Sequence, residues 1–120
     1  MTFAPPIPIL RSFDEALAKQ FYCDYLGFKI DWEHRFEPGL PLYMQVSRDA
    51  CVLHLSEHHR DASPGAAVRI SHPDVREFHK ELLAKPGYGN NPGLQDQDWG
   101  MREVNVADPF SNRLVFCTAI

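Results

Sequence analysis

The sequence predicts an α+β fold made of two tandem β-α-β-β-β units. Two stretches of helical spacing lie about 60 residues apart, one near residues 17–26 and one near residues 75–82. Each is preceded by one short strand-like segment and followed by three more. At 120 residues the chain suits one domain, with a first repeat at about 1–60 and a second at about 61–120.

The first unit begins with a strand over residues 6–11, whose prolines restrict it to a sheet edge or an exchanged arm. Ser12-Phe13-Asp14-Glu15 reads as a capping box, in which Ser12 and Glu15 satisfy free amides at a helix start. The helix carries one apolar stripe and ends at Gly27. The three strands that follow are expected at residues 28–33, 42–46 and 51–56.

The second unit repeats this order with little repetition of letters. Residues 66–70 read as a strand, and Ser71-His72-Pro73-Asp74 reads as a helix start with proline in the first turn. Lys85-Pro86-Gly87 ends that helix. The remaining strands are expected near Leu94 and at residues 101–106 and 114–117, with a turn at residues 108–112 whose proline and short polar side chains favour it.

A sheet covered by a helix on one face leaves the other face free to line a cavity. Alternation along the strands assigns a mixture of polar and apolar side chains to this open face. Such a mixture is more typical of a ligand cleft than of a second core. The side chains assigned to it are Tyr43, Gln45, Val52, His54, Ser56, Glu103, Asn105 and Val115.

Composition excludes several classes of partner. The formal net charge of −4 and the lack of a concentrated basic segment argue against nucleic acid. No apolar run is long enough to span a membrane, and the first ten residues lack the basic region of a signal peptide. The three cysteines, Cys23, Cys51 and Cys117, have no C-x-x-C spacing, so we expect free thiols in the reducing cytoplasm.

Two motifs resemble those of the vicinal oxygen chelate superfamily, which includes glyoxalases, extradiol dioxygenases and bleomycin-resistance proteins. Residues 21–28, FYCDYLGF, are similar to a helix-end pattern of this family, and Asp108-Pro109 is similar to its last hairpin. Trp99-Gly100-Met101-Arg102-Glu103 with Asn112 most resembles the bleomycin-resistance branch. The resemblance covers essentially the whole chain.

Enzymes of this superfamily hold a divalent metal with four side chains on the open faces. Carried over by position, these places fall near Ile7, His54, Ala67 and Val115, of which His54 alone can ligate. One imidazole is too few donors for a catalytic metal. We therefore expect no metal and no cofactor.

Three histidines, His54, His58 and His59, lie within six residues and could suggest a metal site. Two of them share a strand face but lie too far apart for one ion. The alternative is that His54 is a polar cleft-lining or partly buried residue with a hydrogen-bond partner, and that His58 and His59 begin a polar loop.

The bleomycin-resistance proteins exchange N-terminal strands about a proline and form two clefts at the dimer interface. The resemblance implies a strand-exchanged homodimer with Pro8 as the hinge, and a ligand-binding site of Trp32, Phe36, Tyr43, His54, Trp99 and Glu103. Trp99 corresponds to an aromatic residue that stacks on the ligand. The family has further aromatic residues where this chain has Ala66 and Ala67, which leaves the identity of the ligand open.

Each site residue also has a structural interpretation. Trp99 could pack at the rim of the dimer interface, and Trp32, which alternates with Phe28 and Ile30, could be a core residue. Phe36, among polar neighbours, could belong to a lid. Glu103 could attract a cation or pair across the sheet.

The resulting hypothesis is a metal-independent binding protein that confers resistance by sequestering a planar or cationic small molecule such as bleomycin. The alternative is a glyoxalase-like or dioxygenase-like enzyme of the same superfamily with an atypical site around His54, or a metal-free isomerase that uses His54 or Glu103 as a base.

Overall fold

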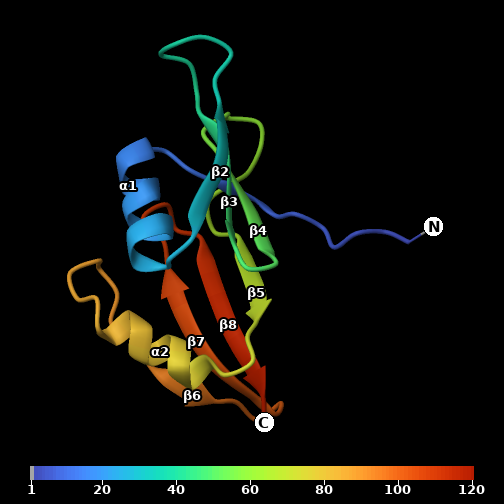
Figure 1. Ribbon diagram of the computed structural model, residues 1–120, viewed down its shortest axis with the longest axis vertical. Helices are drawn as coiled ribbons and strands as arrows, with labels where there is room; N and C mark the ends of the chain where they lie inside the picture. The colour runs from blue at the N-terminus through green and yellow to red at the C-terminus, as the bar shows by residue number, and fades with distance from the viewer. Residues whose placement is uncertain (1) are drawn as a thin grey trace.

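The computed structural model describes residues 2–120 and confirms the repeated β-α-β-β-β order (Figure 1). Apart from the first strand, the expected strand bounds agree with the observed ones to within two residues. The first unit contains β1 (Ile9–Arg11), α1 (Glu15–Lys19), the π-helical segment η1 (Gln20–Tyr25), β2 (Lys29–His34), β3 (Tyr43–Arg48) and β4 (Cys51–Ser56). The second contains β5 (Ala67–Ser71), α2 (Val75–Leu83), β6 (Leu94–Asp96), β7 (Met101–Ala107) and β8 (Arg113–Ala119).

Each unit forms a four-stranded mixed sheet with the same strand pattern. The orders are β1-β4-β3-β2 and β5-β8-β7-β6, and the first pair in each is parallel while the others are antiparallel. Figure 1 shows α1 beside the first sheet and α2 beside the second. The apolar side chains of both sheets and both helices belong to one core, which leaves the opposite strand faces uncovered by helix.

Both helices are capped later in the chain than the sequence suggests. Asp14, and not Ser12, caps α1, and its carboxylate accepts a hydrogen bond from Leu17 N at 2.9 Å. Asp74 caps α2 in the same way, so Pro73 lies before the cap and outside the first turn. An aspartate with extended backbone competes successfully for this role because its short carboxylate reaches the free amides.

The two units are joined by a buried polar cluster around Asp108. Its carboxylate accepts hydrogen bonds from the Tyr22 hydroxyl at 2.6 Å and from the Asn112 side chain at 2.7 Å. It also accepts from the backbone amides of Phe110 and Asn112 within its own turn, both at 2.8 Å. The Asn112 side chain donates in addition to the Arg11 carbonyl at 2.8 Å, so the β7–β8 turn is tied to both α1/η1 and β1.

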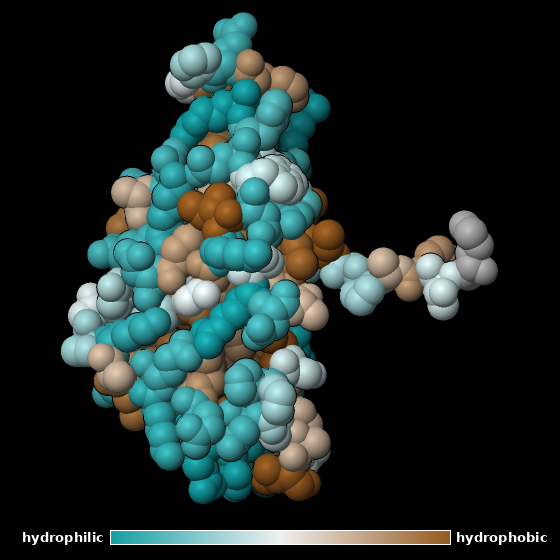
Figure 2. Space-filling model, in the orientation of Figure 1, coloured by the Kyte–Doolittle hydropathy of each residue, from teal (hydrophilic) through white to brown (hydrophobic). Residues whose placement is uncertain are grey.

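The N-terminal segment is less regular than predicted. The expected strand at residues 6–11 begins only at Ile9, and residues 2–7 are exposed and extend away from the sheets. Figures 1 and 2 show this arm projecting from the body. Phe3, within the arm, is fully exposed. Pro8 lies at its base, where its carbonyl accepts a hydrogen bond from His54 N at 3.0 Å.

The structure also bears on membrane-spanning helices and on the three cysteines. No helix within residues 2–120 is long and apolar enough to cross a bilayer. All three cysteines are free; Cys117 is buried, whereas Cys23 and Cys51 are half-buried.

Candidate ligand-binding site

Three aromatic rings gather on the open face of the first sheet. Trp32 stacks on Tyr43 with ring centroids 5.9 Å apart and an interplanar angle of 8°. His54 meets both rings edge-on, at 5.3 Å from Trp32 and 5.2 Å from Tyr43. Such offset and edge-to-face contacts are the favoured geometries of aromatic pairs. Trp32 nevertheless keeps 43% of its surface exposed, so its indole remains available to a ligand.

A β-bulge places Trp32 on this face. Ile30 lies opposite Val46, whereas Trp32 lies opposite Gln45, so the register shifts by one residue at Asp31. Val46 faces the core and Gln45 faces outward. The extra residue therefore reverses the alternation, and the interpretation of Trp32 as a core residue is wrong.

Hydrogen bonds engage both ring nitrogens of His54. Its Nδ1 lies 2.6 Å from the Tyr43 hydroxyl and its Nε2 lies 2.9 Å from Gln45 Oε1. The Gln45 amide nitrogen donates to Asp31 at 3.1 Å, which fixes Gln45 Oε1 toward the imidazole. That oxygen can only accept, so His54 carries its proton on Nε2 and accepts from Tyr43 at Nδ1.

The electrostatics of His54 agree with this arrangement. Burial lowers the pKa of the imidazole below its ordinary value of 6.5, because desolvation penalises the charged form. Burial also raises the pKa of the Tyr43 phenol, to which the charge of Asp61 adds. Both rings are thus neutral at pH 7, so the cluster of Trp32, Tyr43 and His54 carries no charge of its own.

A pocket of about 390 Å³ lies next to these rings, at the end of the first sheet. Phe36 stands at its rim with 74% of its surface exposed and contacts His34 at a centroid distance of 5.0 Å. His58 lies within 6.4 Å of both Phe36 and Tyr43. The pocket is lined by His34, Phe36, Tyr43, His58, His59, Arg60 and Asp61.

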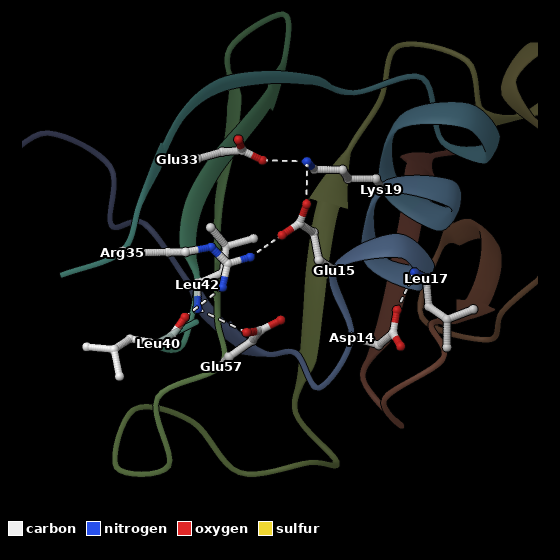
Figure 3. Close-up of polar contacts among 9 residues, drawn as sticks. All are labelled: Asp14, Glu15, Leu17, Lys19, Glu33, Arg35, Leu40, Leu42 and Glu57. Atoms are coloured by element: carbon white, nitrogen blue, oxygen red, sulfur yellow. Dashed lines mark hydrogen bonds and ion pairs between the residues drawn. The ribbon is translucent and has the colours of Figure 1, made fainter. Parts of the chain in front are cut away.

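The loop that carries Phe36 is anchored at its base (Figure 3). Arg35 pairs with the Glu15 carboxylate on α1. Lys19 lies 3.0 Å from the same carboxylate and 2.6 Å from Glu33 at the end of β2. This network fixes the points from which the loop departs, and so directs Phe36 toward the pocket.

Trp99 and Glu103 lie together on the second sheet. The Trp99 indole N–H donates to Glu103 Oε2 at 3.1 Å, and Arg69 Nη2 donates to the same oxygen at 2.5 Å. Glu103 is only 3% exposed, whereas Trp99 is 63% exposed. The hydrogen bond from Arg69 is the main cause that lowers the pKa of Glu103 below 4.5, so the carboxylate is ionised at neutral pH.

The whole chain, residues 1–120, matches the family model described as glyoxalase superfamily protein. The chain belongs to the glyoxalase superfamily. Comparison of the sequence with curated proteins finds no significant match.

Solved structures of this superfamily share the fold. A bleomycin-binding protein from bleomycin-producing Streptomyces verticillus, complexed with copper(II)-bleomycin, is 28% identical, with a TM-score of 0.72 over 100% of this chain and 98% of that one. A second bleomycin-binding protein, complexed with bleomycin, is 20% identical, with a TM-score of 0.73 over 98% and 100%. A superfamily member from Sphaerobacter thermophilus is 18% identical, with a TM-score of 0.71 over 96% and 97%.

The residues at the metal positions of this superfamily do not fit a divalent ion. Strand register places Ile9 opposite His54 and Arg69 opposite Val115, so β1 and β5 are each displaced from the expected Ile7 and Ala67. Ile9 and Arg69, which take these positions, offer no additional metal ligand. Both ring nitrogens of His54 already have protein partners. No three His, Cys, Asp or Glu side chains of residues 2–120 are grouped so that they could hold one ion.

The predicted site residues form two groups in this glyoxalase-superfamily chain. Trp32, Phe36, Tyr43 and His54 come together on the first sheet, and Trp99 and Glu103 on the second. Three of the side chains assigned to the open faces are buried and do not line an open surface: Ser56, Glu103 and Val115.

Sequence reasoning missed Arg69, Gln45's role as a fixed acceptor, and His58. Arg69 had a detectable signal, because it is the one charged residue within the apolar strand Ala67–Ser71. The sequence does predict Gln45 on the open face and His58 at the start of a loop, but their contacts join strands and loops that local patterns do not bring together.

Proposed function

We propose that this protein is a metal-independent binding protein that sequesters a flat small molecule of the bleomycin type. The observation that carries the proposal is the exposed, uncharged ring system of Trp32 and Tyr43 beside a pocket of about 390 Å³. Flat ligands gain both dispersion and apolar burial on such a surface. The structural relatives that are complexed with bleomycin support the same ligand class.

Binding without chemical change follows from the state of His54. A general base needs a free lone pair within reach of a substrate, but the Nδ1 lone pair of His54 accepts from Tyr43. A Lewis-acid site needs several donors, and the superfamily's positions here supply one imidazole. The enzymatic alternative around His54 therefore has less support than sequestration.

We further propose a homodimer in which each arm, residues 2–7, packs on the partner about Pro8. Residues 3–7 of the arm, Phe-Ala-Pro-Pro-Ile, are all apolar and all exposed, and contiguous exposed apolar surface of this kind marks an interaction site. In such a dimer the first sheet of one chain faces the second sheet of the other, which would unite the two groups of site residues. We also propose that the protein acts in the cytoplasm and that it confers drug resistance.

The ligand assignment is tested by titration calorimetry with metal-free and copper-loaded bleomycin. We expect one bleomycin per chain at micromolar concentration, and about tenfold weaker binding by Trp32→Ala because one stacking partner is lost. Leu83→Ala, an exposed apolar residue on α2, is the matched control and should bind as the wild type does.

Absence of heat at micromolar bleomycin, together with no protection of DNA from bleomycin cleavage, would exclude the drug. Elemental analysis of protein purified without chelator tests the enzymatic alternative. A stoichiometric transition metal that is lost in His54→Ala would favour an enzyme over a binding protein.

The dimer is tested by analytical ultracentrifugation of protein lacking residues 2–7. We expect a folded monomer, because the truncation leaves both sheets and the core intact. If the truncated protein remains a dimer, the arm is not needed for the interface and this part of the proposal is wrong.

A further inference from the structure

Arg69 occupies the open face of the second sheet and has no role in the proposal above. It lies in β5, opposite Val115 of β8, and its side chain is 51% exposed. One of its five N–H donors goes to Glu103 Oε2, and the guanidinium lies beside the Cys117 thiol. Because half of the side chain is exposed, donors that neither Glu103 nor Cys117 engages are open to solvent.

Glu103 cannot act as a free anion on this face. Its carboxylate is buried, and both Arg69 and the Trp99 indole donate to it. Along the described strands of this face, the other charged side chain is Arg113, which also lowers the pKa of Glu103. The charged side chains on this face of the strands are therefore two arginines and one buried glutamate, and the exposed guanidinium of Arg69 carries a positive charge.

The same carboxylate oxygen orients a flat surface next to the guanidinium. Because Trp99 and Arg69 both donate to Glu103 Oε2, their side chains are neighbours. The indole is held through its N–H while most of its ring is exposed. A guanidinium presents a planar fork of donors that matches a carboxylate, sulfonate or phosphate.

We propose that Arg69 binds the acidic group of a flat aromatic ligand whose rings lie against Trp99. Glu103 is then a positioning residue that aligns Arg69 and Trp99. This inference rests on the proposed binding of a flat small molecule, but it assigns that molecule an acidic group, since it replaces the attraction of a cation to Glu103 with recognition of an anion by Arg69.

Three probes that share a naphthalene ring but differ in charge test the inference: the anion 2-naphthoate, the neutral 2-naphthamide and the cation 2-naphthylmethylammonium. Their dissociation constants are measured by ligand-observed NMR with the full-length protein at pH 7. We expect naphthoate to bind about tenfold more tightly than naphthamide, the size of one charge-assisted contact, and the cation to bind most weakly.

The variants separate recognition from folding. Arg69→Met/Glu103→Gln removes both charges without leaving a buried carboxylate unpaired, and it should abolish the preference for naphthoate. Glu103→Gln alone keeps a side-chain oxygen that can accept from Arg69 and Trp99 but removes the negative charge that competes for Arg69, so it should strengthen naphthoate binding several-fold. Asp98→Asn removes one negative charge from the Trp99 turn without touching Arg69, and Arg76→Met removes an exposed arginine on α2. Both controls should leave the preference unchanged.

An unchanged naphthoate preference in the double variant would overturn the inference, as would a wild-type protein that prefers the cation. Failure of bleomycin to bind leaves this result intact, because the naphthyl probes report on Arg69 whatever the natural ligand is. Bleomycin binding without any charge preference among the probes would sink the inference and spare the proposed function.

Discussion

The two sheets of this protein share one topology but differ in what their open faces carry. The first sheet presents Trp32, Tyr43 and His54, three neutral rings held by mutual contacts. The second presents Trp99 beside the Arg69–Glu103 ion pair. The strand order therefore fixes where side chains stand, while the chemistry of each face is set independently by a few outward positions.

This difference also shows how the two faces are kept rigid. On the first sheet, a chain of hydrogen bonds from Asp31 through Gln45 to His54 locks the rings. On the second, one buried carboxylate orients two side chains. Either device gives preorganised groups, but the neutral rings of the first sheet suit stacking and the charged pair of the second suits recognition of charge.

The largest predicted loss of stability is at Asp108, where the two units meet. Asp108→Ala removes a buried acceptor of four hydrogen bonds and leaves Tyr22 and Asn112 donors unpaired. We expect the free energy of unfolding to fall by about 4 kcal/mol, measured by urea denaturation.

Tyr22→Phe is the matched control, because it removes one donor of this cluster and keeps the ring in the core. It should cost about 1.5 kcal/mol. Equal losses in both variants would mean that Asp108 stabilises only through Tyr22, and that its own turn contributes nothing.

The ends of the two helices provide a second comparison. Gly27 follows η1 and Gly87 follows α2, and both have positive φ, 78° and 97°. An added Cβ at Gly27 would lie 2.8 Å from Arg48 Nη1, whereas nothing lies within 4 Å at Gly87. Arg48 forms a bidentate pair with Glu81 at 2.7 and 2.8 Å and so links β3 to α2.

Gly87→Ala should therefore cost about 1 kcal/mol of unfolding free energy, from backbone strain alone. Gly27→Ala should cost about 2 kcal/mol, because it adds displacement of Arg48 to the same strain. Thermal unfolding of both variants measures this difference. Equal losses of unfolding free energy would show that the Arg48 side chain moves aside at no cost, and that its ion pair between the units contributes little stability.

Local patterns were sufficient for the repeated order of elements and for the outward faces of Tyr43 and His54, whereas Trp32 and Phe36 were named from the family resemblance. Periodicity and alternation are local, so they predict which strand and which face a residue occupies. They failed at Asp31, where a single extra residue reverses the face of Trp32. A bulge depends on pairing with the neighbouring strand, which one segment of sequence does not reveal.

The second group was predicted less well, for a related reason. Glu103 was expected on the open face, where it would either attract a cation or pair across the sheet. It does pair across the sheet, but its partner Arg69 is 34 residues away in the sequence and could not be named from local patterns. The capping residues were displaced because Ser12 is buried beside the end of β1, so Asp14 becomes the first residue free to cap. Charge pairing and capping are decided by tertiary contacts that local patterns do not contain.

The smallest predicted effect is a change in tryptophan fluorescence with pH, which should occur in a different pH range on each of the two sheet faces. The chain has two tryptophans, so Trp99→Phe reports on Trp32 beside His54, and Trp32→Phe reports on Trp99 beside Glu103. Both His54 and Glu103 have lowered pKa values in the fold, so each binds its proton less readily than in the unfolded chain. Each therefore contributes stability that is lost as pH falls, but in different windows.

For His54 that window begins at 6.5 and extends downward to its folded pKa. Protonation breaks the hydrogen bond from Tyr43, so Trp32 fluorescence should change as pH falls below this value. For Glu103 the window begins at 4.5, and Trp99 fluorescence should stay constant until the solution is more acidic than that. His54→Gln and Glu103→Gln, each in the corresponding single-tryptophan background, should remove the respective transition. If both tryptophans respond together near pH 6, the two faces are coupled, and the independence of their chemistry is wrong.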